Sequence, residues 1–225
     1  MTAIPFRVSV RLVLGVLAAV AVAAGADAEG RPAQVNRPAA YAGAAAKQVH
    51  AGDIYLLRGF ADIFSRGLDE LGAKLVEHGI DVKVIGHGAW ESAASTIIAN
   101  QKRHGRKPVV LIGHSLGANA AILIAERLRA RNIEVQYLVT FAATAPEPVP
   151  GNVEKVANYY FATHGWGEKL VGAAGFHGAL DNKDYSEAQN IGHFNIEKQA
   201  DIHEEVIRNV VRIIRPGMGT GKAKS

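Results

Sequence analysis

Short apolar runs alternate with segments of helical periodicity along residues 53–215, and this alternation constrains the fold most. The run at residues 108–112 is apolar throughout, which is typical of a strand covered on both faces. Strands separated by helices imply crossover connections and a parallel sheet. The sequence therefore predicts an α/β fold with about five to six mostly parallel strands and helices on both faces. The periodicity places strands at 54–57, 81–85, 108–112, 135–141 and 156–161, and helices at 62–77, 90–104, 115–131 and 197–214.

The first 28 residues have the pattern of a secretory signal peptide. Arg7 and Arg11 precede an apolar run at 12–24, and a small-residue cleavage site ends at Ala28. The run is shorter than the roughly 20 apolar residues that a spanning helix needs, which disfavours the alternative of an uncleaved anchor. We expect export to a bacterial periplasm or beyond, with no stable membrane anchor after cleavage.

Two further segments lack any regular period. Residues 29–52 are rich in Ala, Pro and Gly and are predicted to form a linker or irregular arm. Residues 216–225 are predicted to be a flexible tail. Residues 53–215 remain as one domain.

The composition excludes several classes of protein. The 225 residues are 48% hydrophobic, enough for a buried core, and contain no cysteine. A disulfide scaffold, a thiolate zinc site and a cysteine nucleophile are therefore excluded. The pI of about 9.3 reflects a net charge of only +4 with scattered Lys and Arg, so it does not indicate a nucleic-acid partner.

Cofactor and metal motifs are also incomplete. Gly86 and Gly88 lack the third glycine of a dinucleotide-binding turn, and His203 lacks a second histidine one helical turn on. We expect no cofactor and no metal.

The most informative segment is Gly-His-Ser-Leu-Gly at 113–117, directly between the apolar strand and a long helix. This is the pattern of a nucleophile elbow, in which a sharp turn projects the serine hydroxyl above the sheet. Gly113 and Gly117 leave room where the backbone approaches its neighbours. Ser115 is the candidate nucleophile, and the N–H of Leu116 at the helix start can donate to an oxyanion.

With this motif the chain resembles the α/β-hydrolase fold, specifically its lipase, esterase and thioesterase-like members, from about residue 53 to 214. The segments Leu-Arg-Gly at 57–59 and Phe-Ser-Arg-Gly-Leu-Asp at 64–69 resemble small exported bacterial members. The chain lacks the first two strands of the family, so the resemblance implies a minimal version. It also implies that the N–H of Phe60, after the first core strand, is the second oxyanion donor.

The family order implies a histidine base after the last strand. His193 stands on a loop just before the closing helix and is the preferred base, with His177 in reserve. His114, inside the elbow, is expected to point away from the serine.

The third member of the triad is less defined. The family pattern predicts an Asp at position 142, where this chain has Ala142. Asp184 is the preferred carboxylate, and the alternatives are Asp181, Glu168 and Glu147. A dyad completed by a backbone or side-chain carbonyl remains open, as does a degenerate site.

The predicted reaction is hydrolysis of small carboxylic esters or thioesters through an acyl-enzyme on Ser115. A glycine-rich stretch with Trp166 and Phe176 is either a flap over an acyl pocket or an ordinary surface loop. The alternative function is a non-catalytic envelope binding protein with an incomplete triad.

Overall fold

The computed structural model describes residues 51–60, 65–163 and 166–216. These residues all fall within one compact unit of the chain, Ala45–Ser225. The predicted signal peptide at 1–28 lies outside the described residues, as do most of the arm at 29–52 and all of the tail except Pro216.

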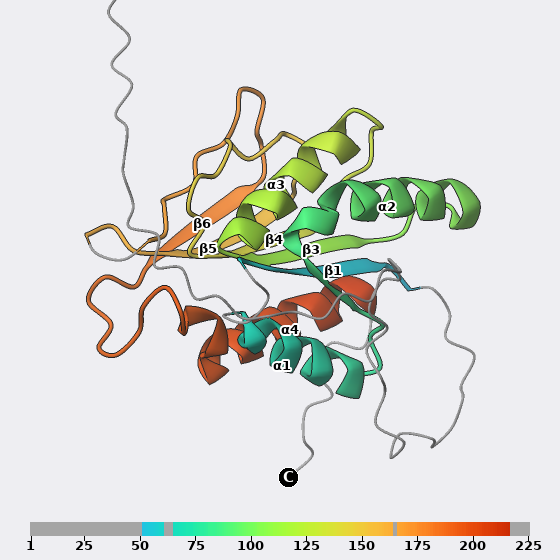
Figure 1. The fold of residues 1–225 in the computed structure, drawn as a ribbon. Coiled ribbons are helices and arrows are strands. Elements are labelled where there is room, and N and C mark those ends of the chain that lie inside the picture. Colours follow the sequence, from blue (N-terminus) through green and yellow to red (C-terminus); the bar gives the residue numbers. More distant parts are fainter. Residues whose placement is uncertain (1–50, 61–64, 164–165, 217–225) are drawn as a thin grey trace, which may run out of the picture. The chain divides into compact units, whose positions relative to one another are not determined.

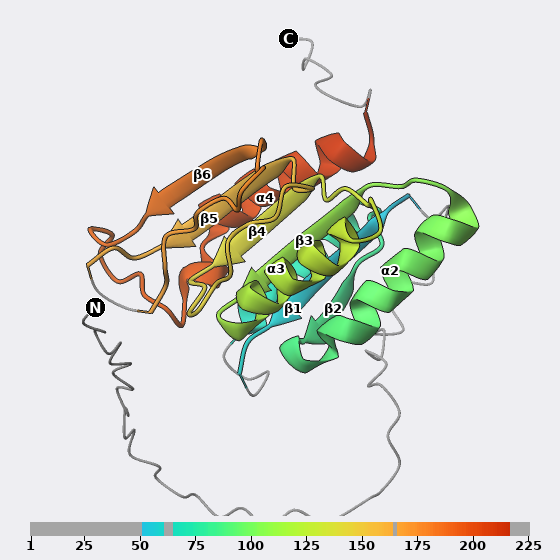
Figure 2. The same cartoon turned by 90° about the horizontal axis from the view of Figure 1, so that it is seen from above.

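Within the described ranges, six strands form one parallel sheet in the order β2-β1-β3-β4-β5-β6 (Figure 2). The strands are β1 (Asp53–Arg58), β2 (Lys83–Gly86), β3 (Val109–His114), β4 (Tyr137–Phe141), β5 (Lys155–Tyr160) and β6 (Ala179–Asp184). The helices are α1 (Arg66–Glu77), α2 (Trp90–His104), α3 (Leu116–Arg129) and α4 (Ala200–Ile214), with single 3-10 turns η2 (His87–Ala89) and η3 (Ile196–Lys198).

Helices cover both faces of the sheet. Helices α1 and α4 lie against one face, and α2 and α3 lie against the other (Figure 1). Alternate residues of β3 enter the two cores: Val110 and Ile112 pack toward α1 and α4, whereas Val109 and Leu111 pack toward α2 and α3. Burial on both sides explains why the strand is apolar throughout.

The α/β prediction is confirmed, and the five strands expected from the sequence are all present. The sequence analysis placed no strand at β6, whose residues Ala-Leu-Asp-Asn-Lys-Asp are mostly polar. Strand β6 pairs only with β5 and forms one edge of the sheet, so it carries little of the apolar signal used to find strands. The helix predicted from residue 62 begins at Arg66, and residues 62–64 lie outside the described ranges.

Because every strand runs in the same direction, their carboxyl ends share one edge of the sheet. The segments that leave this edge include Gly59 after β1, Ser115 after β3, Ala142 after β4 and the loop that carries His193 after β6. Ligands bind at this edge in open α/β sheets, so the topology gathers the predicted site residues in one place.

The turn from β3 into α3 packs against β1 without space for extra atoms. A Cβ at Gly117 would lie 2.0 Å from the carbonyl oxygen of Leu57, and one at Gly113 would lie 2.2 Å from that of Gly117. Both neighbours are backbone atoms held in the sheet or the helix, so they cannot move aside easily. These two glycines set how closely α3 approaches the sheet.

We predict that Gly117→Ala lowers the free energy of unfolding by about 3 kcal/mol, because the added methyl group overlaps the backbone of β1. Gly88→Ala is the matched control, since a Cβ there meets nothing within 4 Å. We expect the control to change stability by less than about 0.5 kcal/mol. Urea unfolding measures both variants, and equal stabilities would contradict the packing argument.

Candidate active site

Ser115 lies in a strained turn between β3 and α3. Its backbone has φ 57° and ψ −122°, a left-handed conformation that is costly for a residue with a side chain. The Ser115 N–H donates to the carbonyl of Phe141 at 2.9 Å, which ties the turn to the end of β4. The residue is 8% exposed and opens onto the carboxyl edge of the sheet. This is the strand–turn–helix context that a nucleophile elbow requires.

His193 contacts Ser115 directly. Its Nε2 atom is 3.0 Å from the Ser115 Oγ atom, and the residue is 7% exposed. The two residues are 78 positions apart in the sequence. The structure therefore brings together the serine and the histidine that the sequence analysis selected, at the distance at which a base can take a hydroxyl proton.

The second ring nitrogen of His193 faces a backbone carbonyl. Nδ1 makes a short hydrogen bond with the carbonyl oxygen of Trp166. A carbonyl can only accept, so Nδ1 carries the proton and Nε2 is left to accept the proton of Ser115. The carbonyl thus fixes the tautomer and the orientation of the ring, a task that a carboxylate performs in a Ser-His-Asp triad. Burial lowers the pKa of His193 below its ordinary value, which favours the neutral ring.

Asp184 does not reach His193, which corrects the preference for it as the third triad member. Its Oδ1 atom accepts hydrogen bonds from the Ser186 hydroxyl at 2.6 Å and from the N–H groups of Ser186 and Ala162 at 2.9 and 3.1 Å. These contacts join the segments that follow β5 and β6. The partner of His193 Nδ1 is the Trp166 carbonyl, not Asp184.

The other candidate carboxylates are also elsewhere. Asp181 lies 3.5 Å from the ammonium of Lys183, and Glu147 and Glu168 are exposed. Glu168 lines a cavity that adjoins the Ser115 site through Thr144 and Trp166 but contains neither Ser115 nor His193. Over the described ranges, no hydrogen bond joins His193 to any of these groups. The open alternative of a dyad completed by a backbone carbonyl matches this geometry.

The loop that presents the Trp166 carbonyl lies over the position where the family pattern predicts an Asp. A Cβ at Gly167 would be 2.9 Å from the Cα atom of Ala142. The Glu168 N–H donates to the Ala143 carbonyl at 2.7 Å, and the Phe161 N–H donates to the Gly167 carbonyl at 3.3 Å. Ala142 is fully buried, and this loop packs directly against it. The alanine and the carbonyl contact are therefore two parts of one arrangement.

A row of buried polar side chains fixes the same loop to the sheet. The Thr140 hydroxyl donates to the Asn158 Oδ1 atom at 2.8 Å, and Asn158 Nδ2 donates to the Glu168 carbonyl at 3.0 Å and to Asn182 Oδ1 at 2.7 Å. Asn182 in turn bonds both the N–H and the carbonyl of Leu170. The row spans β4, β5 and β6. The polar residue Asn182 of β6 therefore has a structural role.

The two predicted oxyanion donors flank Ser115. Leu116 is the first residue of α3, where N–H groups have no carbonyl within the helix to bond. Phe60 lines the cavity that contains Ser115. A Cβ at Gly59 would lie 3.0 Å from the Cβ atom of Ser115, so the loop after β1 passes close to the nucleophile. The Gly59 N–H donates to Ser65 Oγ at 2.9 Å, so it is already bonded and is not one of the oxyanion donors.

A mainly apolar cavity of about 330 Å³ opens above Ser115 and His193. Its wall contains three exposed aromatic residues, Phe60, Trp166 and Phe194, which are 68%, 67% and 51% exposed. Leu116 and Thr144 complete the wall. Exposed apolar surface gathered at one place marks a binding site.

Only part of the glycine-rich stretch reaches the site. Trp166 packs edge-on to His193 at 5.6 Å between ring centroids, whereas Phe176 packs against the core beneath α2 and α3. The two expected aromatic residues of a flap are therefore separated. Of these two residues, only Trp166 lies at the Ser115 site.

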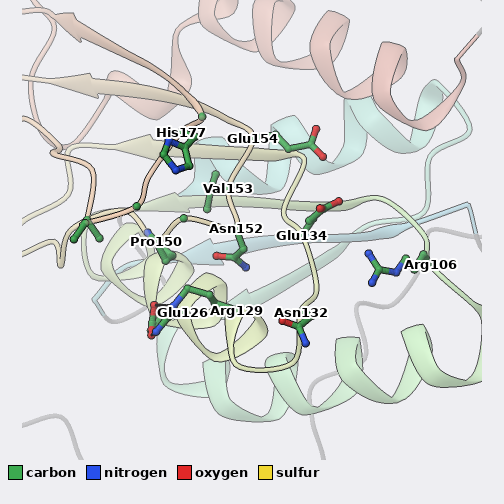
Figure 3. A pocket seen from close by; sticks show the side chains of 15 residues that line it. Arg106, Glu126, Arg129, Asn132, Glu134, Pro150, Asn152, Val153, Glu154 and His177 are labelled. Carbon is green, nitrogen blue, oxygen red and sulfur yellow. Dashed lines mark hydrogen bonds and ion pairs between the residues drawn. The ribbon is translucent and has the colours of Figure 1, made fainter.

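A larger cavity of about 1000 Å³ lies at the opposite, amino edge of the sheet. Figure 3 shows Arg106, Glu134, Asn152 and His177 around it, all from segments that precede strands. Its lining residues include no hydroxyl or thiol side chain. The reserve base His177 belongs to this cavity and not to the Ser115 site. Of these two cavities, only the smaller one contains a hydroxyl group next to a histidine, so it is the candidate active site.

The described ranges contain neither a candidate membrane-spanning helix nor a candidate metal cluster. No helix there has both the length and the apolar character to cross a membrane. No cluster of three or more His, Asp or Glu residues there could hold a metal ion.

Comparison with known families also points to a hydrolase. Residues 86–160 match the family described as Thioesterase domain. The match covers about a third of the chain, from the end of β2 to the end of β5, and includes Ser115 but not His193. No curated protein sequence matches the chain. Together with the parallel sheet, the match supports a thioesterase- or esterase-like α/β-hydrolase and the hydrolysis of esters or thioesters in general.

The contact between His193 Nδ1 and the Trp166 carbonyl could not be predicted from the types of residue in the sequence. A backbone carbonyl is present at every position, so no sequence signal distinguishes Trp166 as the partner of His193. The substitution of Ala142 for the expected Asp was the one available sign.

The buried histidines predict a loss of stability in acid. Burial lowers the pKa of His114 from about 6.5 to about 4, so below pH 6.5 the unfolded chain binds protons that the folded chain does not. The free energy of unfolding therefore falls as the pH falls, and His114 alone accounts for about 2 kcal/mol between pH 7.5 and pH 5. Urea unfolding at the two pH values tests this against His114→Gln. An equal pH dependence of the two proteins would contradict the assignment.

Proposed function

We propose that this protein is a serine hydrolase of small carboxylic esters or thioesters that forms an acyl-enzyme on Ser115 with His193 as base. The observation that carries the proposal is the 3.0 Å contact between Ser115 Oγ and His193 Nε2 at a strained strand-to-helix turn. The match to the thioesterase family supports the type of bond cleaved.

The first half of the reaction acylates Ser115. His193 Nε2 takes the hydroxyl proton while Ser115 Oγ attacks the acyl carbon. The carbonyl oxygen of the substrate becomes an oxyanion, to which the N–H groups of Leu116 and Phe60 donate. When the tetrahedral intermediate collapses, the bond to the alcohol or thiol breaks, and the leaving group takes the proton from His193.

The second half releases the acid. Water gives a proton to His193 Nε2 and its oxygen attacks the acyl carbon of the acyl-enzyme. The second intermediate collapses with return of that proton to Ser115 Oγ, so the carboxylic acid leaves and the enzyme is regenerated. The Trp166 carbonyl accepts the Nδ1 hydrogen bond throughout and supports the imidazolium that forms in each half. The acyl group lies in the cavity walled by Phe60, Leu116 and Phe194.

We predict that Ser115→Ala and His193→Ala each lower kcat on a p-nitrophenyl ester of a short-chain acid by about 10³-fold or more, because each removes half of the dyad. Asp184→Asn is the contrasting variant, since Asp184 contacts Ser186 and not His193. We expect its kcat to stay within about threefold of the parent value. Steady-state kinetics of the purified variants provides the measurement.

Two outcomes would overturn parts of this proposal. Full activity in Ser115→Ala would remove the serine mechanism and favour the alternative of a binding protein. A loss of 10³-fold or more in Asp184→Asn would restore a carboxylate triad in place of the carbonyl-completed dyad.

We also propose that the protein is exported, on the basis of the charged, apolar and small-residue pattern of residues 1–28. We expect the protein isolated from the periplasm of a bacterial host to have the mass of a chain that begins at Glu29. Ala28→Leu, which removes the small residue before the cut, is expected to retain the full-length mass. A periplasmic parent protein that retains Met1 would argue for an uncleaved anchor.

A further inference from the structure

A second histidine, His114, lies behind the dyad in full burial. It is the last residue of β3 and immediately precedes Ser115, and its ring centroid is 5.1 Å from that of His193. It makes no hydrogen bond to the Ser115 side chain. Its two ring nitrogens instead contact Ser65, just before α1, and the backbone of His193.

The directions of these hydrogen bonds follow from the chemistry of the partners. His114 Nε2 is 2.7 Å from the His193 carbonyl oxygen, which can only accept, so Nε2 carries the proton. Nδ1 of a neutral ring then accepts, and the Ser65 hydroxyl at 2.8 Å donates to it. Ser65 Oγ in turn accepts from the Gly59 N–H at 2.9 Å. Every donor and acceptor in this series of hydrogen bonds therefore has one consistent role.

This series of hydrogen bonds joins the three segments that the proposed reaction uses. Gly59 precedes Phe60 on the oxyanion loop, His114 precedes Ser115 in the elbow, and the far end of the series is the backbone of His193. His193 is thereby held at two points, by His114 at its main-chain carbonyl and by Trp166 at its ring. Displacement of any of the three segments by about 1 Å is enough to cost a factor near 10² in rate.

The surroundings of His114 favour a neutral ring. Burial lowers its pKa to about 4. The charged or titratable groups that face it are His193, the buried carboxyl group of Glu197 at 3.9 Å from Nε2, and Lys198, whose ammonium is 3.8 Å from that carboxyl group. Burial raises the pKa of the Glu197 carboxyl group, which favours its neutral form beside a neutral His114. A cationic His114 beside His193 would oppose the imidazolium that forms during the reaction.

We propose that His114 is a positioning residue that sets the place of the base and of the oxyanion loop through Ser65 and the His193 carbonyl. This inference rests on the proposed function, because it takes His193 as the base. It assigns a role in the reaction to a histidine that touches no reacting atom.

The test compares three variants on the same p-nitrophenyl ester. His114→Leu removes both ring contacts, His114→Gln keeps an amide donor for the His193 carbonyl, and Ser65→Ala removes only the partner of Nδ1. We expect His114→Leu to lower kcat about 10²-fold with KM changed less than about threefold, because His114 itself does not line the cavity. We expect His114→Gln to recover at least about tenfold of that loss and Ser65→Ala to lie between the parent and His114→Leu.

The pH profile separates positioning from a general effect on folding. A loosened His193 gains water, so the acid limb of kcat/KM is expected to move up toward the ordinary histidine pKa in His114→Leu. If that variant does not fold, His114→Gln and Ser65→Ala decide the question. Folded variants whose kcat and acid limb match those of the parent would overturn the inference while Ser115→Ala remained inactive.

A measurement without turnover covers the case in which the proposed function itself fails. Nitrogen NMR of the labelled full chain reports which ring nitrogen of each histidine carries its proton. We expect the Nε2–H tautomer for His114 and the Nδ1–H tautomer for His193. The opposite tautomer at His114 would overturn the inference independently of any activity.

Discussion

The close packing of the β3–α3 turn against β1 is the constraint on which the site depends. Gly113 and Gly117 lie where any Cβ would overlap backbone atoms, so the helix begins almost in contact with the sheet. That proximity forces Ser115 into its left-handed conformation and presents its hydroxyl at the carboxyl edge. It also places the first N–H groups of α3 next to the nucleophile. The packing of the fold and the geometry of the site therefore both depend on the β3–α3 turn.

The base is organised by neutral hydrogen-bond acceptors and donors in place of a carboxylate. The Trp166 carbonyl holds the ring of His193, and His114 holds its backbone. Both supports are buried or packed against buried polar groups, where hydrogen bonds are stronger than in water. A carbonyl stabilises an imidazolium less than an ionised carboxylate does, so substrates with good leaving groups suit this arrangement best.

Much of the fold could be predicted from the sequence because its central strands are buried on both faces. Strand β3 and the elbow were clear for that reason, and the position of His193 before α4 followed from the family resemblance. Strand β6 was missed because an edge strand that carries Asn182 for a polar row has no apolar pattern. Asp184 was preferred as the acid because it is a carboxylate just upstream of His193, on a turn expected to return toward the site, whereas the partner of His193 is a backbone atom. The Ser65–His114 contact joins residues 49 positions apart and has no local signature.

The central claim is that Ser115 is a nucleophile activated by His193 without a carboxylate. Labelling of the folded protein with a fluorophosphonate probe, followed by mapping of the adduct by mass spectrometry, tests this claim most directly. The account predicts one adduct on Ser115, formed at a similar rate in the parent and in Asp184→Asn and much more slowly in His193→Ala. Absence of an adduct on Ser115 in the folded parent protein would contradict it.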